Sequence, residues 1–199
     1  MIASPVTINA QTPATETDCV AIAAPLAQIM RELRVLLAAL SSDQYSARAG
    51  DLFANSTIGG HVRHCLDHAR ALVDGLRTGI VNYDRRARGT NIETDLTAAD
   101  AELGCLIASV ERLAKLDADD SIGVSVMPTR DGVSITLSST LARELAFVLS
   151  HTIHHNATIR GIALSLGGGG AVPATFGYAP STLAHQDGVG GAGSTRCAR

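Results

Sequence analysis

The stretch Ile58-Gly59-Gly60-His61-Val62-Arg63-His64-Cys65-Leu66-Asp67-His68 combines an apolar stripe with three histidines. At about 100° per residue, His61, His64 and His68 fall on one face of a helix. Apolar residues recur at helical spacing from there to about Leu76. The histidines share or border the apolar stripe, so the pattern predicts a helix that turns imidazoles toward the interior of a bundle.

A second cluster, Ser150-His151-Thr152-Ile153-His154-His155-Asn156, repeats this arrangement late in the chain. His151 and His155 lie one helical turn apart. Each histidine taken alone is most simply a hydrogen-bonded surface residue. Two facing clusters, however, would bring several neutral imidazoles to one point, which is how helix bundles build metal sites. Neutral imidazole suits zinc, iron, nickel and copper, and does not suit calcium or magnesium.

The composition limits the class of protein. A length of 199 residues fits one domain, and 46% hydrophobic residues suffice for a sizeable core. The net charge of −3, the 3% aromatic content and the absence of Trp argue against a nucleic-acid partner. No stretch is long and apolar enough to span a bilayer, so no membrane is expected as a partner. The four cysteines form no Cys-x-x-Cys pair, which is typical of reduced thiols in a cytoplasmic protein.

Periodicity predicts four helices and one hairpin. The helices are expected at 25–40, 58–76, from Thr94 or Asp95 to about 116, and from Ser138 or Ser139 to about 166. Alternating apolar runs at 122–126 and 133–137 flank a turn that contains Asp131-Gly132. The predicted fold is therefore all-α, an up-down four-helix bundle with a small β-hairpin inserted before the last helix. Residues 1–18 are expected to be mobile, 19–184 to form the bundle domain, and the Gly-rich 185–199 to be disordered.

The order and spacing of these motifs resemble the DinB/YfiT-like superfamily of four-helix-bundle metal proteins. The resemblance covers roughly Leu26 to Leu183 and is carried by the run from Thr57 to His64 and by His151-x-x-x-His155. It implies a divalent metal (zinc, nickel or iron) held by His64, His151 and His155. It also implies a homodimer and a small-molecule substrate, with a low-molecular-weight thiol such as mycothiol, bacillithiol or glutathione as cosubstrate of a transferase or isomerase.

Further residues are candidates for the same site. His61 and His68 flank His64 and either hydrogen-bond nearby groups or hold a second metal, and His154 is expected beside the site. Glu144 lies nearly two turns before His151 and is a candidate ligand, catalytic general base or carboxylate that orients an imidazole. Its alternative role is to pair with Arg143 or another arginine. Glu93 or Asp95 is expected at the pocket mouth, although Asp95 is more simply a helix N-cap. Glu93 is also a candidate for a second metal or for a group that orients a ligand.

The loop after the second predicted helix is rich in arginine. Tyr83, Arg85, Arg86 and Arg88 could grip an anionic substrate, because guanidinium binds carboxylate with two parallel hydrogen bonds. The alternative is a solvated loop. Cys65 stands next to His64, but a buried helical cysteine is usually an inert apolar residue.

Three functions fit these features. The leading hypothesis is a metal-dependent enzyme, whether transferase, isomerase or oxidoreductase, that activates a thiol or water. The second is a non-heme iron enzyme, mononuclear or dinuclear, that activates oxygen. The third is a non-catalytic metal-binding stress or scaffold protein, which predicts a closed site with no substrate-sized cavity beside it.

Overall fold

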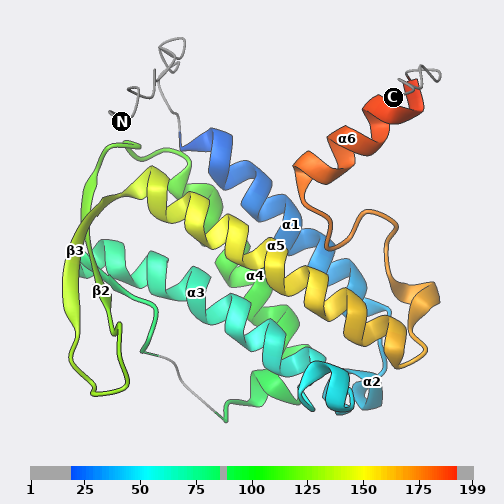
Figure 1. Cartoon of the computed structure of the whole chain (residues 1–199). Helices are drawn as coiled ribbons and strands as arrows, with labels where there is room; N and C mark the ends of the chain where they lie inside the picture. The colour runs from blue at the N-terminus through cyan, green and yellow to red at the C-terminus, as the bar shows by residue number, and fades with distance from the viewer. Residues whose placement is uncertain (1–18, 86–88, 192–199) are drawn as a thin grey trace, which may run out of the picture.

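The computed structural model describes residues 19–85 and 89–191, and four long helices form its body (Figure 1). These are α1 (Val20–Ala38), α3 (Ile58–Thr78), α4 (Leu96–Leu113) and α5 (Leu141–Ser165). The shorter helices are α2 (Ser42–Ser46), α6 (Pro180–Gly191), η1 (Asp51–Phe53), η2 (Asn91–Glu93) and η3 (Gly169–Ala171). The strands are β1 (Ile80–Asn82), β2 (Ser121–Val126) and β3 (Ile135–Thr140).

Side-chain caps set the starts of three long helices. Thr57 accepts a hydrogen bond from the backbone at the start of α3, and Asp95 and Thr140 do the same for α4 and α5. Gly79, at φ 79°, ends α3 in the left-handed conformation. α1 begins at Val20 rather than at Pro25, because the buried residues Cys19 and Ala23 extend its apolar stripe upstream. The predicted helix positions are otherwise close to those observed.

Neighbouring helices in the bundle run antiparallel in two pairs. Arg31 of α1 pairs with Glu111 of α4, and Arg34 of α1 pairs with Asp100 of α4. The residue numbers rise along one helix while they fall along the other, so the two helices run antiparallel. The same reversal joins α3 to α5 through the contacts of His61 with His155 and of His64 with His151.

α3 and α4, in contrast, run parallel. Arg63 of α3 pairs with Glu93 just before α4, and Arg70 of α3 pairs with Glu102 within α4, so the two helices run in the same direction. The predicted up-down alternation is therefore wrong at this step. The physical reason is that η2, which directly precedes α4, packs against Gly59 in the first turn of α3, so both helices begin at the same end of the bundle.

The predicted hairpin is present, but it belongs to a three-stranded sheet in the order β1-β2-β3. β2 and β3 are antiparallel, with Val124 opposite Leu137, and β1 joins β2 in parallel with Val81 opposite Val124. A side chain at Gly75 of α3 would lie 2.6 Å from Val81, so this glycine lets β1 pack closely on the helix. The fold is thus mainly helical with a small sheet, rather than all-α.

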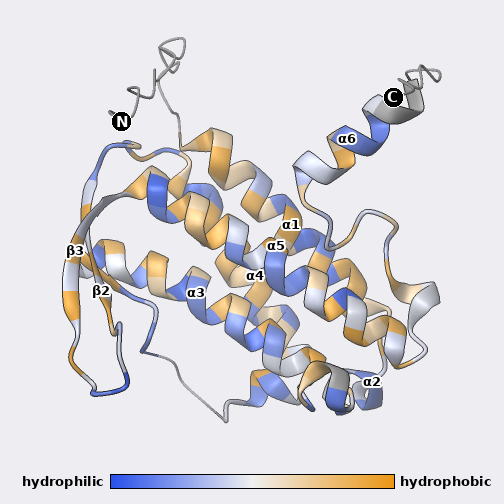
Figure 2. Cartoon of the chain, viewed as in Figure 1, coloured by the Kyte–Doolittle hydropathy of each residue, from blue (hydrophilic) through white to orange (hydrophobic). Residues whose placement is uncertain are grey.

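Buried apolar residues of the four long helices form one core, and Figure 2 shows hydrophobic segments along each of these helices. Fully buried members include Leu26, Leu33, Leu36, Leu66, Leu72, Leu103, Leu141, Leu145 and Ile159. The segment after η3 packs back on α5, where Phe176 is fully buried. No helix in the described part of the chain is both long and apolar enough to cross a membrane.

α6 extends to Gly191 and so reaches into the stretch predicted to be disordered from residue 185. Its residues from Ala184 to Gly188 are exposed. A short solvated helix of this kind buries no apolar stripe, so the periodicity on which the prediction relied is missing. The segment 1–18 and residues 192–199 lie outside the described residues.

Candidate metal centre

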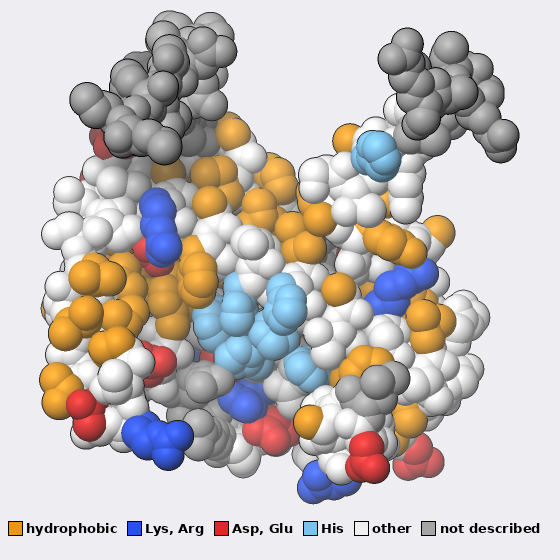
Figure 3. Space-filling model, viewed as in Figure 1, with side chains coloured by type: hydrophobic (Ala, Val, Ile, Leu, Met, Phe, Trp, Pro, Cys, Tyr) orange, Lys and Arg blue, Asp and Glu red, His pale blue; other side chains and the backbone are white. Residues whose placement is uncertain are grey.

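Five histidines from α3 and α5 meet on one open face of the bundle. In Figure 3 their side chains gather at the centre of this face, over the two helices, with hydrophobic side chains beside them toward β2 and β3. The Nε2 atoms of His64 and His151 lie 3.0 Å apart. The predicted convergence of the two clusters is thus present in the structure.

His68 lies closer to this point than the sequence suggests. Its Nδ1 is 3.0 Å from the His64 carbonyl oxygen, and because a carbonyl only accepts, Nδ1 carries the proton. In the neutral ring, Nε2 is then the nitrogen with the lone pair. The His68 ring stacks on His151 with centroids 3.8 Å apart. Among the described residues, His64, His68 and His151 form a group whose ligand atoms all lie within 4.8 Å of one another.

His155 is part of the cluster but makes a different contact. Its ring centroid lies 4.6 Å from that of His64 and 4.5 Å from that of His151. Its Nδ1 lies 2.9 Å from Nδ1 of His61. The ligand set predicted from the sequence, His64, His151 and His155, therefore stays a prediction, while His68 completes the group that the geometry assembles.

The electrostatics of the cluster favour neutral imidazole. Burial, followed by the neighbouring histidines His151, His61, His154 and His68, lowers the pKa of His155 from 6.5 to about 3. Burial and His154 also lower the pKa of His61. Neutral imidazole is the form that binds a transition metal.

The donor set fits a divalent transition metal. Two imidazole nitrogens bound to one tetrahedral zinc ion lie about 3.3 Å apart, given zinc–nitrogen distances of about 2.0–2.1 Å. The separation of 3.0 Å between Nε2 of His64 and of His151 is close to this value. Zinc, nickel and iron all accept such ligands, so the cluster does not select among them.

Comparison with known proteins agrees with this arrangement. A family model described as the DinB superfamily matches residues 26–159, which include both histidine clusters. The chain belongs to the DinB superfamily. A protein of Rhizopus delemar named FK506-binding protein 5 is 35% identical over 107 residues, 53% of this chain and 27% of the relative, so the chain spans about a quarter of that relative's length. No solved structure gives a significant match.

Glu144 of this DinB protein makes hydrogen bonds with three groups beside the cluster. It is fully buried, and its carboxylate accepts hydrogen bonds from Tyr83 (2.8 Å), Ser139 (2.5 Å) and Arg143 (2.7 Å). The expectation of an arginine partner is thus met by Arg143. Its relation to the cluster is indirect, because the Tyr83 ring stacks on His68 with centroids 5.2 Å apart.

A pocket of about 270 Å³ adjoins the cluster on the side of the sheet. Its lining includes Val124, Val126 and Leu137 from the hairpin and Tyr83, Arg143, Glu144 and Phe147. Tyr83 and Phe147 form the wall shared with the cluster, since their rings face His68 and His151. Neither Phe147 nor Ser139 is among the site residues predicted from the sequence, although Phe147 precedes His151 by one helical turn and so shares its face.

Glu93 pairs with an arginine of α3. Its carboxylate is 2.5 Å from Nε of Arg63 and accepts a hydrogen bond from the Gly89 amide. The placement follows from Gly59 in the first turn of α3, where a Cβ would lie 2.0 Å from the Glu93 carbonyl oxygen. These contacts join η2 to α3, and the expected place of Glu93 at a second metal or at the pocket mouth stays a prediction.

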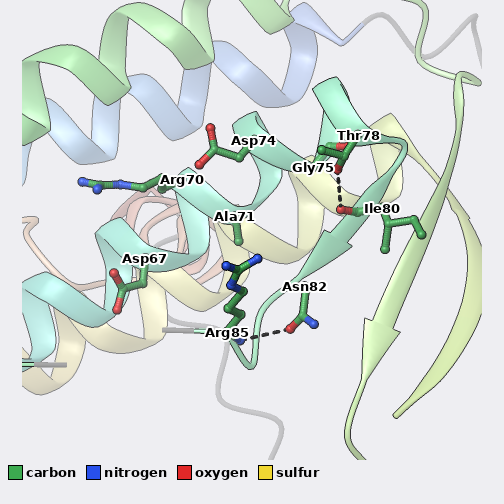
Figure 4. A pocket seen from close by; sticks show the side chains of 9 residues that line it. All are labelled: Asp67, Arg70, Ala71, Asp74, Gly75, Thr78, Ile80, Asn82 and Arg85. Carbon is green, nitrogen blue, oxygen red and sulfur yellow. Dashed lines mark hydrogen bonds between the residues drawn. The ribbon is translucent and has the colours of Figure 1, made fainter. Parts of the chain in front are cut away.

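Arg85 belongs to another pocket, of about 550 Å³, between α3 and the loop after β1. Figure 4 shows its guanidinium reaching toward Ala71 of α3, with Asp67 and Asp74 on the same lining. The residues lining this pocket include no histidine. Arg86 and Arg88 lie outside the described residues. Of the predicted substrate-binding set, the structure thus brings only Tyr83, among the described members, to the cluster.

Two minor expectations are met. His154 is exposed and touches only the edge of the cluster, with its ring 5.2 Å from that of His155. Cys65 is buried, and burial raises the pKa of its thiol to about 12. A protonated thiol is a poor nucleophile and a poor metal ligand.

Proposed function

We propose that this DinB-superfamily protein is a metal-dependent enzyme that transfers a group to or from a low-molecular-weight thiol. The metal is a divalent ion, bound centrally by His64 and His151. His155 is the third ligand by the family spacing, and His68 is a fourth imidazole beside it. The observation that carries the proposal is the 3.0 Å separation between Nε2 of His64 and of His151, on two different helices.

The chemistry follows from the donor set. A divalent metal bound by neutral imidazoles lowers the pKa of a coordinated thiol or water and makes it a nucleophile near neutral pH. The chain's own residues bind and orient the substrate. Tyr83 and Phe147 offer ring faces to an apolar substrate in the adjoining pocket, and Arg143 at its rim offers a guanidinium to an anionic group.

The pocket supports this proposal over a non-catalytic scaffold. A purely structural metal needs no cavity, whereas here a space of about 270 Å³ shares two aromatic walls with the cluster.

The contacts of the buried Glu144 carboxylate argue against a dinuclear iron site that activates oxygen. Its three hydrogen bonds, from Tyr83, Ser139 and Arg143, leave it poorly placed to bridge two iron ions.

Metal content measured by mass spectrometry tests the proposal. We expect near-stoichiometric zinc, nickel or iron in the wild type and a large loss in His64→Ala, His151→Ala and His155→Ala. His154→Ala is the matched control, because this exposed neighbour should leave the content unchanged. Absence of metal in the wild type, even after reconstitution, would overturn the proposal.

A second measurement tests the reaction. The metal-loaded protein is incubated with glutathione, bacillithiol or mycothiol and a panel of apolar electrophiles, and thiol consumption is followed. We expect consumption that requires the metal and that falls in Phe147→Ala. Metal-loaded protein that consumes no thiol with any pair would refute the transferase assignment.

A further inference from the structure

A chain of hydrogen bonds runs from the start of α3 to His155. Ser56, which precedes the capping residue of α3, has its Oγ 2.7 Å from the Phe53 carbonyl oxygen and 3.1 Å from Nε2 of His61. On its other side, His61 places Nδ1 at 2.9 Å from Nδ1 of His155. All three side chains are only partly exposed.

The position of each proton in this chain follows from donor and acceptor chemistry. The Ser56 hydroxyl has one proton, and the Phe53 carbonyl can only accept it. Ser56 Oγ must therefore accept from His61, which places the proton of His61 on Nε2.

The same reasoning fixes the next link. A neutral imidazole carries a single N–H, so Nδ1 of His61 has a lone pair and accepts. The nitrogen facing it, Nδ1 of His155, must donate. His155 is then left with its lone pair on Nε2.

We propose that Ser56 and His61 are positioning residues that hold His155 as the Nδ1–H tautomer, so that its Nε2 is the nitrogen presented to the metal. This inference rests on the proposed function, because it assigns a purpose to the tautomer only if His155 binds the metal. Metal-binding histidines commonly donate their second nitrogen to a neighbouring acceptor that fixes the ring.

His68 supports this interpretation independently. Its Nδ1 donates to the His64 carbonyl at 3.0 Å, so it too is left with the lone pair on Nε2. Two rings of one cluster thus have the same tautomer imposed by two different acceptors, a backbone carbonyl and a second imidazole. The competing role for His61 is direct binding of a second metal ion, which the experiment below distinguishes.

Nitrogen NMR of ¹⁵N-histidine-labelled, metal-free full-length chain reads the tautomers directly. We expect His155 with the proton on Nδ1 and His61 with the proton on Nε2. In Ser56→Ala and in His61→Leu, the His155 signals should shift toward a mixture of tautomers. Finding His155 with its proton on Nε2 in the wild type would overturn the inference.

Zinc titration with a competing chelator provides the second readout. We expect His61→Leu to weaken zinc binding by about 10–100-fold at unchanged stoichiometry, the usual effect of losing such a partner. His61→Asn, whose side-chain oxygen can replace Nδ1 as acceptor, should restore most of the affinity. A drop from two zinc ions to one in His61→Leu, or an unchanged affinity, would contradict the positioning role.

The two readouts separate this inference from the proposed function. If the wild type binds none of zinc, nickel and iron, the proposed function fails and the positioning role fails with it, whatever tautomer NMR finds. If the wild type binds zinc and the His155 tautomer is insensitive to Ser56 and His61, only the inference fails. His154→Leu is the matched control, since the exposed neighbour of His155 takes no part in the chain of hydrogen bonds.

Discussion

The Nε2 atom of His64 lies 3.0 Å from the Nε2 atom of His151, across 87 residues of sequence. Two N–H groups cannot point at each other at this distance, so at least one of the two nitrogens carries a lone pair. One turn away, His61 and His155 make a similar contact through their Nδ1 atoms. The antiparallel packing of α3 and α5 thus sets imidazole against imidazole at successive turns.

The stability of the metal-free protein should depend on pH. The folded-state pKa of His155, about 3, lies below the ordinary value of 6.5, so between these values the unfolded chain binds more protons than the folded chain. The contribution of neutral His155 to the free energy of unfolding is therefore complete above about pH 6.5 and is lost as the pH falls toward 3. His61, whose pKa is also lowered, acts in the same direction.

Thermal unfolding with a chelator present measures this dependence. We expect the Tm to fall from about pH 7 to about pH 5, and to fall less steeply in His155→Gln. His185→Gln is the control, because His185 is exposed on α6, outside the cluster. Equal slopes for the wild type and His155→Gln would contradict the prediction.

Tyr83→Phe should destabilise the fold by about 1–3 kcal/mol, because it removes one of three hydrogen bonds to a buried carboxylate. The ring that stacks on His68 is retained, so metal content should not change. Urea unfolding is the measurement. Tyr178→Phe removes a hydroxyl from a tyrosine with 38% exposure and should cost less than about 0.5 kcal/mol. Similar losses in both variants would argue against a special role for the Glu144 contact.

Gly59→Ala should destabilise the protein by about 1–3 kcal/mol through overpacking. The added Cβ would lie 2.0 Å from the Glu93 carbonyl oxygen, so η2 would have to move away from α3. Gly104→Ala in α4 is the matched helical control, since its nearest neighbour, the Arg34 guanidinium, would be 3.7 Å away. Alanine there should stabilise by about 0.5–1 kcal/mol. Chemical denaturation measures the stability of both variants. A Gly59→Ala variant as stable as the wild type would show that η2 is loosely held against α3.

Arg160→Met should loosen the segment 172–179 without unfolding the bundle. The guanidinium donates to the carbonyls of Pro173, Ala174 and Phe176 and lies 4.8 Å from the Tyr178 ring centroid. Hydrogen exchange should become faster in this segment and stay unchanged in α3. Arg31→Met removes an exposed ion pair with Glu111 and should leave hydrogen exchange unchanged both in the segment 172–179 and in α3. Unchanged exchange in the segment would mean that burial of Phe176 alone holds it.

Local chemistry determined much of this protein from the sequence alone. Thr57, Asp95 and Gly79 mark helix ends because capping needs only neighbouring backbone groups. The hairpin follows from a change of period around Asp131-Gly132. The spacing of the histidines along each helix likewise fixes which imidazoles share a face. This was enough to predict that the two clusters meet.

Tertiary structure decided the features that depend on groups far apart in the chain. The parallel run of α3 and α4 follows from the packing of η2 on the first turn of α3. The pairing of β1 with β2 joins two segments, and no local pattern in either one indicates the other as its partner. Glu144 accepts a hydrogen bond from Tyr83, and Glu93 pairs with Arg63, although both partners are distant in the sequence. Whether an imidazole faces a metal or another ring depends on the rotation and depth of two packed helices, which the spacing within either helix does not set.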